Sequence, residues 1–357
     1  MSLRAEFPVC ERAAFLNAGS DGPVPQRSIE AVREEVELQA VEGRHAAYFA
    51  RGAELRRRQR EAYARLLGCL PEELALTTCT SEGIATVVAG FGRGDRIVTS
   101  DEEHPGVHGP LAQARARGAE IVVAPFERLP DAVDAATTAV VCSHVSWVTG
   151  ALAPAELSSV GAPVIYDGAQ GVGAVPVDVK VLGCAAYAGS GQKWLCGPDG
   201  SGMLYLAPEF RERVPTLAPA YANLADPAAG LEAEVWPDAR AWDASVLSGE
   251  SSRSALTSLD VLAEAGWNNV HTRGVELAAR LASMLADAGH AVRSRGDTTL
   301  VSWECTNAVA ANERAREAGV LIRSLPGLDL LRASVGAWND ESDLERLLSA
   351  LAHRVSP

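Results

Sequence analysis

Short apolar runs that alternate with helical patterns fill the middle of this chain, and they constrain its fold more than any other feature. Most runs are apolar throughout, as strands covered on both faces should be. They are Leu74–Thr77, Arg96–Ser100, Glu120–Ala124, Ala139–His144, Pro163–Tyr166, Ala185–Ala188 and Gly202–Leu206. Helical patterns separate the earlier runs at 82–91, 107–117, 131–136 and 154–160. The alternation predicts an α/β fold with a mostly parallel, seven-stranded sheet and right-handed crossovers.

The regions on either side of this alternation predict further elements. Amphipathic helices are predicted over 26–42 and 53–67, and the Ala/Pro-rich stretch 215–240 predicts a long loop near a domain or subunit boundary. Beyond it, the predicted elements are two helices within 251–288, a strand Thr298–Cys305, a helix 308–318, a β-pair around Val320–Arg323 and Leu330–Val335, and a helix 340–353. We therefore expect a large domain over residues 16–245 and a small α+β domain formed by residues 1–15 and 246–357.

Charge and cysteine content argue against several classes of protein. With 32 Lys+Arg against 46 Asp+Glu, the formal net charge is −14, which disfavours a nucleic-acid-binding surface. No apolar run approaches the ~18 residues of a membrane span, and the first residues lack a signal-peptide pattern. The seven scattered cysteines fit reduced thiols better than a disulfide framework or a zinc site. We expect a cytoplasmic protein with no membrane or nucleic-acid partner and no bound metal.

Lysine is rare in this chain, which limits where amine chemistry can occur. Of the 32 cationic residues only Lys180 and Lys193 are lysines, and arginine cannot be deprotonated in a protein. Lys193 lies in Gly-Ser-Gly-Gln-Lys-Trp-Leu, where glycines allow close approach of a ligand and apolar neighbours lower the pKa of an amine. This pattern indicates a lysine that forms a Schiff base, the alternative being a surface lysine in a turn. Lys180 has the surroundings of a solvated loop residue.

Polar residues follow several predicted strands, at the sheet edge where open α/β proteins bind ligands. Asp167 would either pair with the protonated ring nitrogen of a cofactor or cap a helix. Thr80 and Ser81 begin a helix whose N-terminus suits a phosphate dianion, although simple capping explains them equally well. His104 would lie over an aromatic ring or transfer protons.

Arg332 lies in an apolar strand pattern, where an unpaired guanidinium would be costly. It therefore needs an anionic partner, either a protein carboxylate or a substrate carboxylate. A phosphate cradle, a ring-nitrogen carboxylate, a histidine, a lysine and this arginine together make the parts of a pyridoxal-phosphate site.

At these motifs the sequence resembles the class V, fold-type I pyridoxal-phosphate enzymes, from about Phe15 to the C-terminus. This family includes cysteine desulfurases, selenocysteine lyases, cysteine/cystine C–S lyases and isopenicillin-N-epimerase-like proteins. The similar segments are Phe15-Leu-Asn17, Thr80-Ser-Glu82, Glu103-His104, His144-Val-Ser-Trp-Val-Thr-Gly150, Asp167-Gly-Ala-Gln170, Ser190-Gly-Gln-Lys193 and Arg332-Ala-Ser334. The resemblance implies the fold-type I transferase fold, a homodimer and a small amino-acid substrate.

The resemblance also implies a role for single residues. Lys193 would hold the cofactor as an internal aldimine and act as general base, His104 would stack on the ring, and Asp167 would contact the pyridine nitrogen. The implied cofactor-binding residues are Thr80, Ser81, His104, Asp167, Gln170, Ser190, Gln192 and Lys193. Arg332 would bind the substrate α-carboxylate, with Asn17 from the opening motif also assigned to the substrate.

Three departures from the desulfurase pattern shape the expected reaction. The segment Ile322–Arg332 is short and lacks the nucleophilic cysteine of desulfurases, Trp147 replaces an asparagine, and Gln192 replaces a histidine. We therefore expect C–S β-elimination from a cysteine-like amino acid, through an aldimine and an aminoacrylate.

Two alternatives to this reaction remain at this stage. One is an aminotransferase or epimerase of class V. The other is an inactive regulatory module of the same fold, which the retention of Lys193 disfavours. Candidates for the side-chain pocket, each alone better explained by packing or exposure, are Arg44, His45, Tyr48, Trp242 and Arg323.

Overall fold

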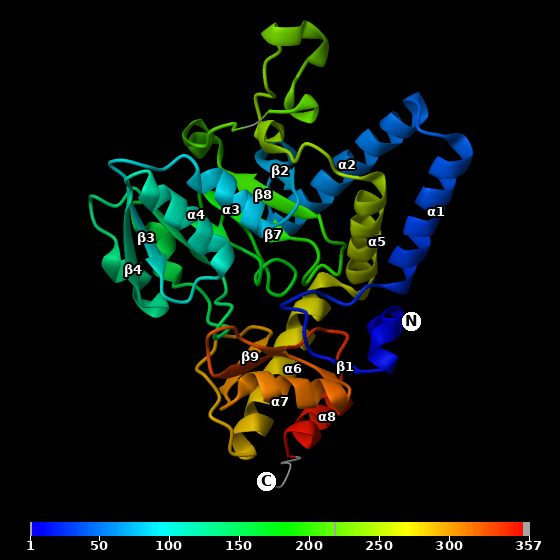
Figure 1. Ribbon diagram of the computed structural model, residues 1–357, viewed down its shortest axis with the longest axis vertical. Coiled ribbons are helices and arrows are strands. Elements are labelled where there is room, and N and C mark those ends of the chain that lie inside the picture. Colours follow the sequence, from blue (N-terminus) through cyan, green and yellow to red (C-terminus); the bar gives the residue numbers. More distant parts are fainter. Residues whose placement is uncertain (1, 218, 353–357) are drawn as a thin grey trace.

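A seven-stranded sheet forms the centre of the larger part of the molecule in the computed structural model, which describes residues 2–217 and 219–352 (Figure 1). Its strands are β2 (Leu74–Thr77), β3 (Arg96–Ser100), β4 (Glu120–Ala124), β5 (Ala139–Ser143), β6 (Val164–Asp167), β7 (Ala186–Ser190) and β8 (Gly202–Leu206). They lie in the order β2-β8-β7-β6-β5-β3-β4, and only β8 runs in the direction opposite to the other six strands. The predicted α/β fold with a mostly parallel seven-stranded sheet is confirmed.

Helices between the strands agree with the predicted pattern in the first half of the sheet only. The helices α3 (Thr80–Val88) and α4 (Pro105–Ala116) each begin two residues earlier than predicted. The helical stretches predicted at 131–136 and 154–160 are short 3-10 turns and not α-helices: the second lies at Ala155–Ser159 as predicted, whereas the first lies earlier than predicted, at Phe126–Ala132. Both segments are too short for a stable α-helix, and a proline lies within the first and directly before the second.

Close packing of α3 on the sheet brings its first turn to the strand ends. Gly83 lies against β7 and β8, where an added Cβ would come within 2.8 Å of the Ala188 Cβ. Any larger residue at this position would push the helix away. The start of α3 therefore lies next to the carboxyl end of β7.

A helical hairpin and a long loop project from the sheet (Figure 1). The hairpin consists of α1 (Gln26–Glu42) and α2 (Ala46–Leu67), and it packs on α5 (Gly249–Ala265). The second helix begins seven residues before its predicted start at residue 53. Residues 219–240 form only short 3-10 turns and one isolated bridge, as expected for a loop. None of the described helices combines the length and the apolar character that a membrane span requires.

The C-terminal part packs helices against a three-stranded antiparallel sheet. Its elements are α6 (Trp267–Asp287), β9 (Leu300–Glu304), α7 (Ala308–Glu317), β10 (Val320–Leu321), β11 (Arg323–Ser324), β12 (Leu330–Ser334) and α8 (Glu341–Ala352). Residue 353, the last of the predicted final helix, lies outside the described residues.

The expected β-pair is right only in part, because β11 pairs with β12 whereas β10 pairs in parallel with β1 (Ala14–Phe15) from the N-terminal segment. A partner more than 300 residues away leaves no mark on the local sequence. The division into domains at residues 15 and 245 stays a prediction.

Candidate active site

The predicted site residues meet in one cavity of about 270 Å³, between the strand ends of the large sheet and strands β11 and β12. Its lining consists of Gly19, Ser20, Cys79, Thr80, Ser81, His104, Trp147, Asp167, Ala169, Gln170, Ser190, Gln192, Lys193, Arg323 and Arg332. Every predicted cofactor residue is in this group. Of the five side-chain-pocket candidates, only Arg323 lines the cavity, and of the two substrate residues, Asn17 does not.

The start of α3 forms a cradle at one end of the cavity. Thr78 donates through its backbone N–H (2.5 Å) and its hydroxyl (2.7 Å) to Glu82 Oε2, which fixes the preceding turn. The Ser190 hydroxyl accepts from Thr80 N (3.0 Å) and lies 2.7 Å from Thr80 Oγ1. Cys79 is the N-cap residue and its side chain makes no capping hydrogen bond, so simple capping by Thr80 or Ser81 is wrong. The free N–H groups and the helix dipole suit a phosphate.

Asp167 ends β6 on the floor of the cavity. Its Oδ1 accepts from Ala169 N at 2.9 Å, and a tight turn rather than a helix follows, so the helix-cap alternative is wrong. Burial raises the pKa of this carboxyl, and the Lys193 ammonium opposes that rise. A buried carboxylate with one committed oxygen can pair with a protonated ring nitrogen.

Lys193 follows β7 and points a half-buried side chain into the same cavity. Within residues 2–217 and 219–352 its amine has no hydrogen-bond partner, and burial lowers its pKa. Asp167 acts in the opposite direction. The amine is therefore easier to deprotonate than an exposed one, as a nucleophile or a general base requires.

The other lysine is engaged elsewhere. Lys180 donates to Glu73 Oε1 at 2.6 Å and to Tyr205 Oη at 3.1 Å, and it does not line the cavity. Lys180 is exposed in a turn, so the prediction of a solvated loop residue is confirmed, and its ammonium also compensates the charge of the buried Glu73.

His104 caps α4 beside the cavity. Its Nδ1 accepts from Gly106 N at 3.0 Å, and its ring meets Trp147 edge-on with centroids 5.1 Å apart. Burial, followed by the charge of Lys193, lowers the pKa of His104 to about 4. The ring is therefore neutral at physiological pH and can cover a planar ligand without adding charge.

Glu103 is a buried carboxyl that sequence reasoning quoted only as part of a motif. It accepts from Ser143 N (3.0 Å) and Ser143 Oγ (2.7 Å) and from Ser100 Oγ (2.5 Å), so it joins β3 to β5 just before His104. Burial raises its pKa to about 7. The signal that could have revealed it is an acidic residue three positions after the end of a mostly buried strand.

The two glutamines of the cavity differ in whether their side-chain amides are hydrogen-bonded within the protein. Gln170 donates to Gly19 O at 2.8 Å and accepts from Trp194 Nε1 at 3.0 Å, so its orientation is fixed. Gln192 has a buried Oε1 with no partner in the described part of the chain. Its amide is available to a ligand.

Arg332 forms the opposite side of the cavity and is almost completely buried. Its Nη1 donates to Trp147 O at 2.8 Å, whereas Nε and Nη2 have no partner among the described residues. No carboxylate of that part of the chain pairs with it, so the protein-carboxylate alternative is wrong. Burial, together with Arg323, lowers its pKa. Such a site is suited to an anionic ligand.

Arg323 and Ser20 complete this side of the cavity. Arg323 Nη1 donates to Ser20 Oγ at 3.0 Å, and Ser20 donates to Asn17 Oδ1 at 2.9 Å. Asn17 therefore orients Ser20 instead of reaching the cavity itself. Sequence reasoning missed Ser20 because its contact depends on a strand 303 residues further along.

Comparison with known protein families leads to the same assignment as the sequence motifs. The family model for aminotransferase class-V matches residues 15–229. The chain belongs to this family, and the resemblance inferred from the motifs is confirmed.

Particular relatives carry more specific names. A probable cysteine desulfurase of Methanothermobacter thermautotrophicus is 30% identical over 226 residues, which are 58% of this chain and 56% of that protein. A cysteine desulfurase of Escherichia coli is 33% identical over 241 residues, 60% of this chain and 59% of that protein. The chain thus matches less than two thirds of the length of these relatives.

Solved structures resemble the whole chain. The cysteine desulfurase CsdA from Escherichia coli is 25% identical with a TM-score of 0.85, covering 98% of this chain and 96% of that one. The cystine C-S lyase C-DES, in complex with its reaction product cysteine persulfide, is 23% identical with a TM-score of 0.91, covering 97% and 99%. At 23% identity, the similarity to C-DES shows a shared fold.

Proposed function

We propose that this protein is a pyridoxal-phosphate-dependent C–S lyase that acts on a cysteine-like amino acid, with L-cystine as the best candidate substrate. One observation carries the proposal: the Lys193 amine and two nitrogens of the Arg332 guanidinium, which have no partner among the described residues, face one cavity whose remaining lining suits this cofactor. The cofactor supplies an aldehyde that bonds to amines and a ring that accepts the electron pair released at the substrate α-carbon.

The fit of the cofactor rests on side chains already in place. The start of α3 with Thr80 and Ser81, together with Ser190 and Gln192, would hold the phosphate. An added Cβ at Gly106 would lie 2.3 Å from Ser81 Oγ, so this glycine keeps the cradle open. Thr80 and Ser190 hold each other beside this cradle, and Gln192 Oε1 has no partner in the described part of the chain.

The ring and the aldehyde would have separate partners. Asp167 would pair with the pyridine nitrogen, neutral His104 would cover one ring face, and Lys193 would hold the aldehyde carbon. Gln170 would direct its second amide hydrogen toward the phenolic oxygen, because its other two hydrogen-bonding groups are already engaged.

The chain's own residues would then carry the reaction. Arg332 would hold the α-carboxylate of the substrate, which sets the direction of the bond to be broken. The Lys193 amine would accept the α-proton, and its lowered pKa keeps part of it neutral. Trp147 would exclude water while the C–S bond breaks and the sulfur leaves, as the persulfide of the second half from L-cystine or as a thiolate from a cysteine S-conjugate.

Two guanidinium groups favour a substrate with two carboxylates. Arg323 and Arg332 both line the cavity, and neither pairs with a carboxylate in the described chain. L-Cystine carries one carboxylate at each end of its disulfide, so each arginine would bind one of them. C-DES, which shares this fold, is a cystine C-S lyase.

Protein-bound persulfide chemistry is not part of this proposal. The segment Ile322–Arg332 carries no cysteine, and Cys305 lines a different hollow, next to Asp329. The cavity's one cysteine among the described residues is Cys79, directly before the phosphate cradle. The leaving sulfur would therefore depart with its own half of the substrate.

Pyruvate release tests the proposed reaction. The holoenzyme is incubated with L-cystine and with a panel of cysteine S-conjugates, and pyruvate and ammonia are measured in equal amounts if elimination occurs. Tight cofactor binding without pyruvate from any of them would remove the lyase. A shift of the absorbance toward ~330 nm would then indicate the aminotransferase alternative.

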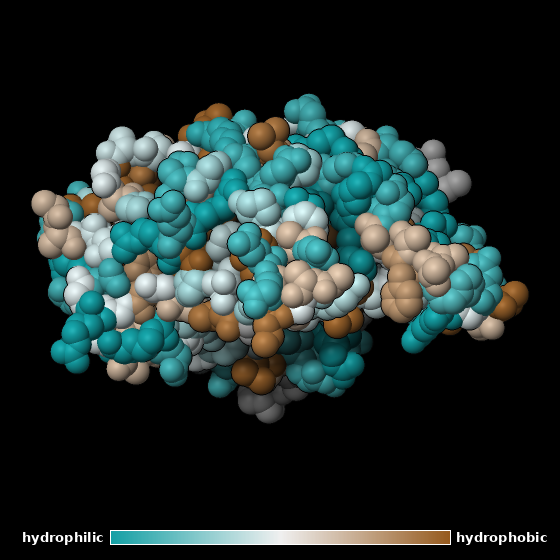
Figure 2. Space-filling model, turned by 90° about the horizontal axis from the view of Figure 1, so that it is seen from above, coloured by the Kyte–Doolittle hydropathy of each residue, from teal (hydrophilic) through white to brown (hydrophobic). Residues whose placement is uncertain are grey.

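A homodimer and a cytoplasmic location complete the proposal. The loop and the segment after it expose four large apolar residues, Leu217, Tyr221, Leu231 and Val246, and Figure 2 looks onto this end of the molecule, where apolar and polar residues intermingle. The resemblance to the class V family implies a homodimer, and these exposed side chains are available to another subunit. Sedimentation equilibrium should give twice the chain mass, and a monomer at all concentrations would contradict this part.

A further inference from the structure

The N-terminal segment crosses the cavity, and its backbone groups contact the side that bears Asp167, Gln170, Gln192 and Lys193, here called the large-domain wall. Gly19 O accepts from Gln170 Nε2 at 2.8 Å, and Gly22 N donates to Gln192 O at 2.7 Å. An added Cβ at Gly22 would lie 2.0 Å from Lys193 O. The segment is thus packed directly against the residue that carries the essential amine.

The same segment is bound to the opposite side of the cavity, which bears Arg323 and Arg332 and is here called the β12 wall. Ser334 N donates to Leu16 O at 2.7 Å, two residues after Arg332 in β12, and Arg323 Nη1 donates to Ser20 Oγ at 3.0 Å. Residues 16–22 therefore connect the wall that bears the arginines with the wall that bears Lys193.

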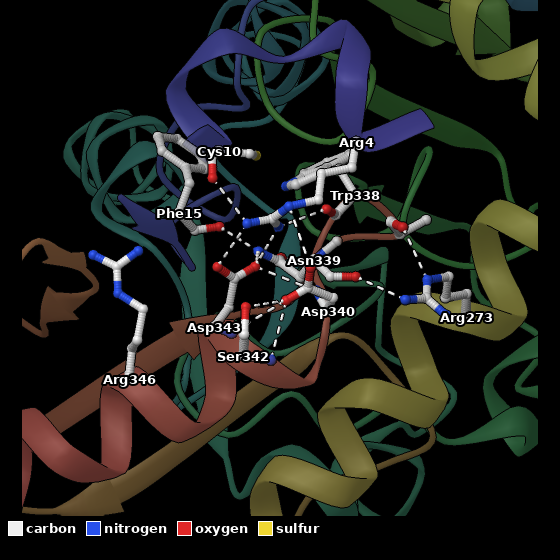
Figure 3. A network of polar contacts seen from close by, with 12 residues as sticks. Arg4, Cys10, Phe15, Arg273, Trp338, Asn339, Asp340, Ser342, Asp343 and Arg346 are labelled. Atoms are coloured by element: carbon white, nitrogen blue, oxygen red, sulfur yellow. Dashed lines mark hydrogen bonds and ion pairs between the residues drawn. The ribbon is translucent and has the colours of Figure 1, made fainter. Parts of the chain in front are cut away.

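One arginine far from the cavity anchors this segment (Figure 3). Arg4 donates to both carboxylate oxygens of Asp343, at 2.6 and 3.1 Å, and lies 3.3 Å from Asp340 Oδ2. It also donates to the backbone oxygens of Trp338 (3.1 Å) and Cys10 (2.8 Å). Asp343 is fully buried, so the forked contact of Arg4 compensates a charge that water cannot reach.

Asn339 transmits this anchor to the start of the crossing segment. Its Nδ2 donates to Asp343 Oδ2 at 2.9 Å and to Phe15 O at 3.0 Å, while its Oδ1 accepts from Gly336 N at 2.9 Å (Figure 3). Phe15 precedes the crossing residues directly. Because β1 contains only two residues, its pairing alone fixes the segment weakly.

We propose that residues 4–22 act as a strap that sets the spacing between the two walls of the cavity, and that the Arg4–Asp343 pair is its positioning anchor. The inference rests on the proposed function in one respect, the role of Arg332 as the carboxylate site. Arg4 touches neither substrate nor cofactor; it fixes the distance between the amine and the guanidinium that the same substrate must reach.

Loosening the anchor should therefore affect substrate binding and leave the cofactor in place. A displacement of about 1 Å between reacting groups lowers rates by up to about 10²-fold. In Arg4→Gln and Asp343→Asn we expect kcat/KM for L-cystine to fall at least about tenfold, mainly through KM. The cofactor's affinity should change much less than KM, because its proposed contacts lie on the large-domain wall and the strap touches only two of the residues that make them, Gln170 and Gln192.

The test compares holoenzymes well below their melting temperatures. Amide hydrogen exchange of residues 13–22 is measured in the wild type, Arg4→Gln, Asp343→Asn and the conservative Arg4→Lys, together with kcat and KM. Arg280→Gln is the matched control, because Arg280 makes an exposed 3.4 Å ion pair with Glu341 on the same helix as Asp343. Both anchor variants should exchange faster at residues 13–22 and show raised KM, Arg4→Lys should be intermediate, and the control should match the wild type.

Two results would overturn the strap. One is unchanged exchange at residues 13–22 in both anchor variants; the other is faster exchange with an unchanged KM, which would mean a purely structural anchor. If the wild type does not cleave L-cystine at all, the proposed reaction fails separately. The strap is then judged by the same exchange data and by the holoenzyme's affinity for L-alanine, which carries a carboxylate but no leaving group.

Discussion

The two walls of the cavity differ in how far their polar groups are already satisfied. On the large-domain wall, Ser190 pairs with Thr80 and Gln170 is held from both sides, and in the described part of the chain Gln192 Oε1 and the Lys193 amine have no partner. On the β12 wall, Arg332 has two unpartnered nitrogens and Ser334 an unpartnered hydroxyl, within the part of the chain that the structure describes. The first wall is preorganised for a permanent ligand, and the second retains buried donors that only a transient anion would satisfy.

Removing the amine of the first wall should have the largest effect. Lys193→Ala is expected to lower kcat by at least about 10³-fold, since both the covalent partner and the base are lost. Lys180→Ala is the matched control, because that lysine is the only other one and pairs with Glu73 far from the lining. Initial rates of pyruvate release measure the effect; equal losses in both variants would contradict the assignment.

The second wall gives a sharper test, because activity and stability should move in opposite directions. Arg332→Met should reduce kcat/KM by about 10²–10³-fold through loss of the carboxylate contact. The cofactor-free variant should nevertheless be more stable than the wild type by about 1–4 kcal/mol, because an uncompensated buried charge is removed.

Arg60 provides the comparison for that variant. It is also buried, but it pairs with Asp243 at 2.5 Å, so Arg60→Met should destabilise the protein by about 3–5 kcal/mol. Urea unfolding of both variants measures these changes in the free energy of unfolding. If Arg332→Met is as destabilising as Arg60→Met, Arg332 has a partner within the protein and the contrast between the walls is lost.

The protonation of Glu103, behind the large-domain wall, offers a third test. The pKa of Glu103 is raised from 4.5 to about 7 by burial, so the folded protein keeps a proton that the unfolded chain has lost. This contribution to stability is complete below about pH 4.5 and is lost as pH rises through about 7. The difference in unfolding free energy between Glu103→Gln and the wild type should therefore shift in favour of the variant from pH 4.5 to pH 8. A difference that does not vary with pH would show that Glu103 is ionised throughout.

The smallest expected effect concerns the second carboxylate of L-cystine, which Arg323 would bind. Arg323→Gln should lower kcat/KM for L-cystine about tenfold, the value of one charged hydrogen bond, and leave S-methyl-L-cysteine nearly unchanged. Ser20→Ala serves as the control, because it removes the hydrogen bond between Ser20 and Arg323 but keeps the charge of Arg323. Equal losses on both substrates would mean that Arg323 supports the α-carboxylate site instead.

The same contrast explains what the sequence could predict. The large-domain wall consists of strand ends followed by short motifs, such as Ser190 to Lys193, so strand periodicity and local composition located it. The β12 wall depends on contacts across more than 300 residues: the pairing of β1 with β10, Ser20 with Arg323, and Arg4 with Asp343. No local pattern encodes such a register. The burial of Glu103 was missed because it depends on β5 lying beside β3.

Borohydride reduction of the pyridoxal-phosphate-loaded protein, followed by peptide mass mapping, tests the central claim most directly. Reduction fixes the cofactor on the amine that holds it, and the chain offers only two lysines. We predict a stoichiometric adduct on Lys193 and none on Lys180. An adduct on Lys180, or no adduct at all, would contradict the assignment of this cavity as the active site.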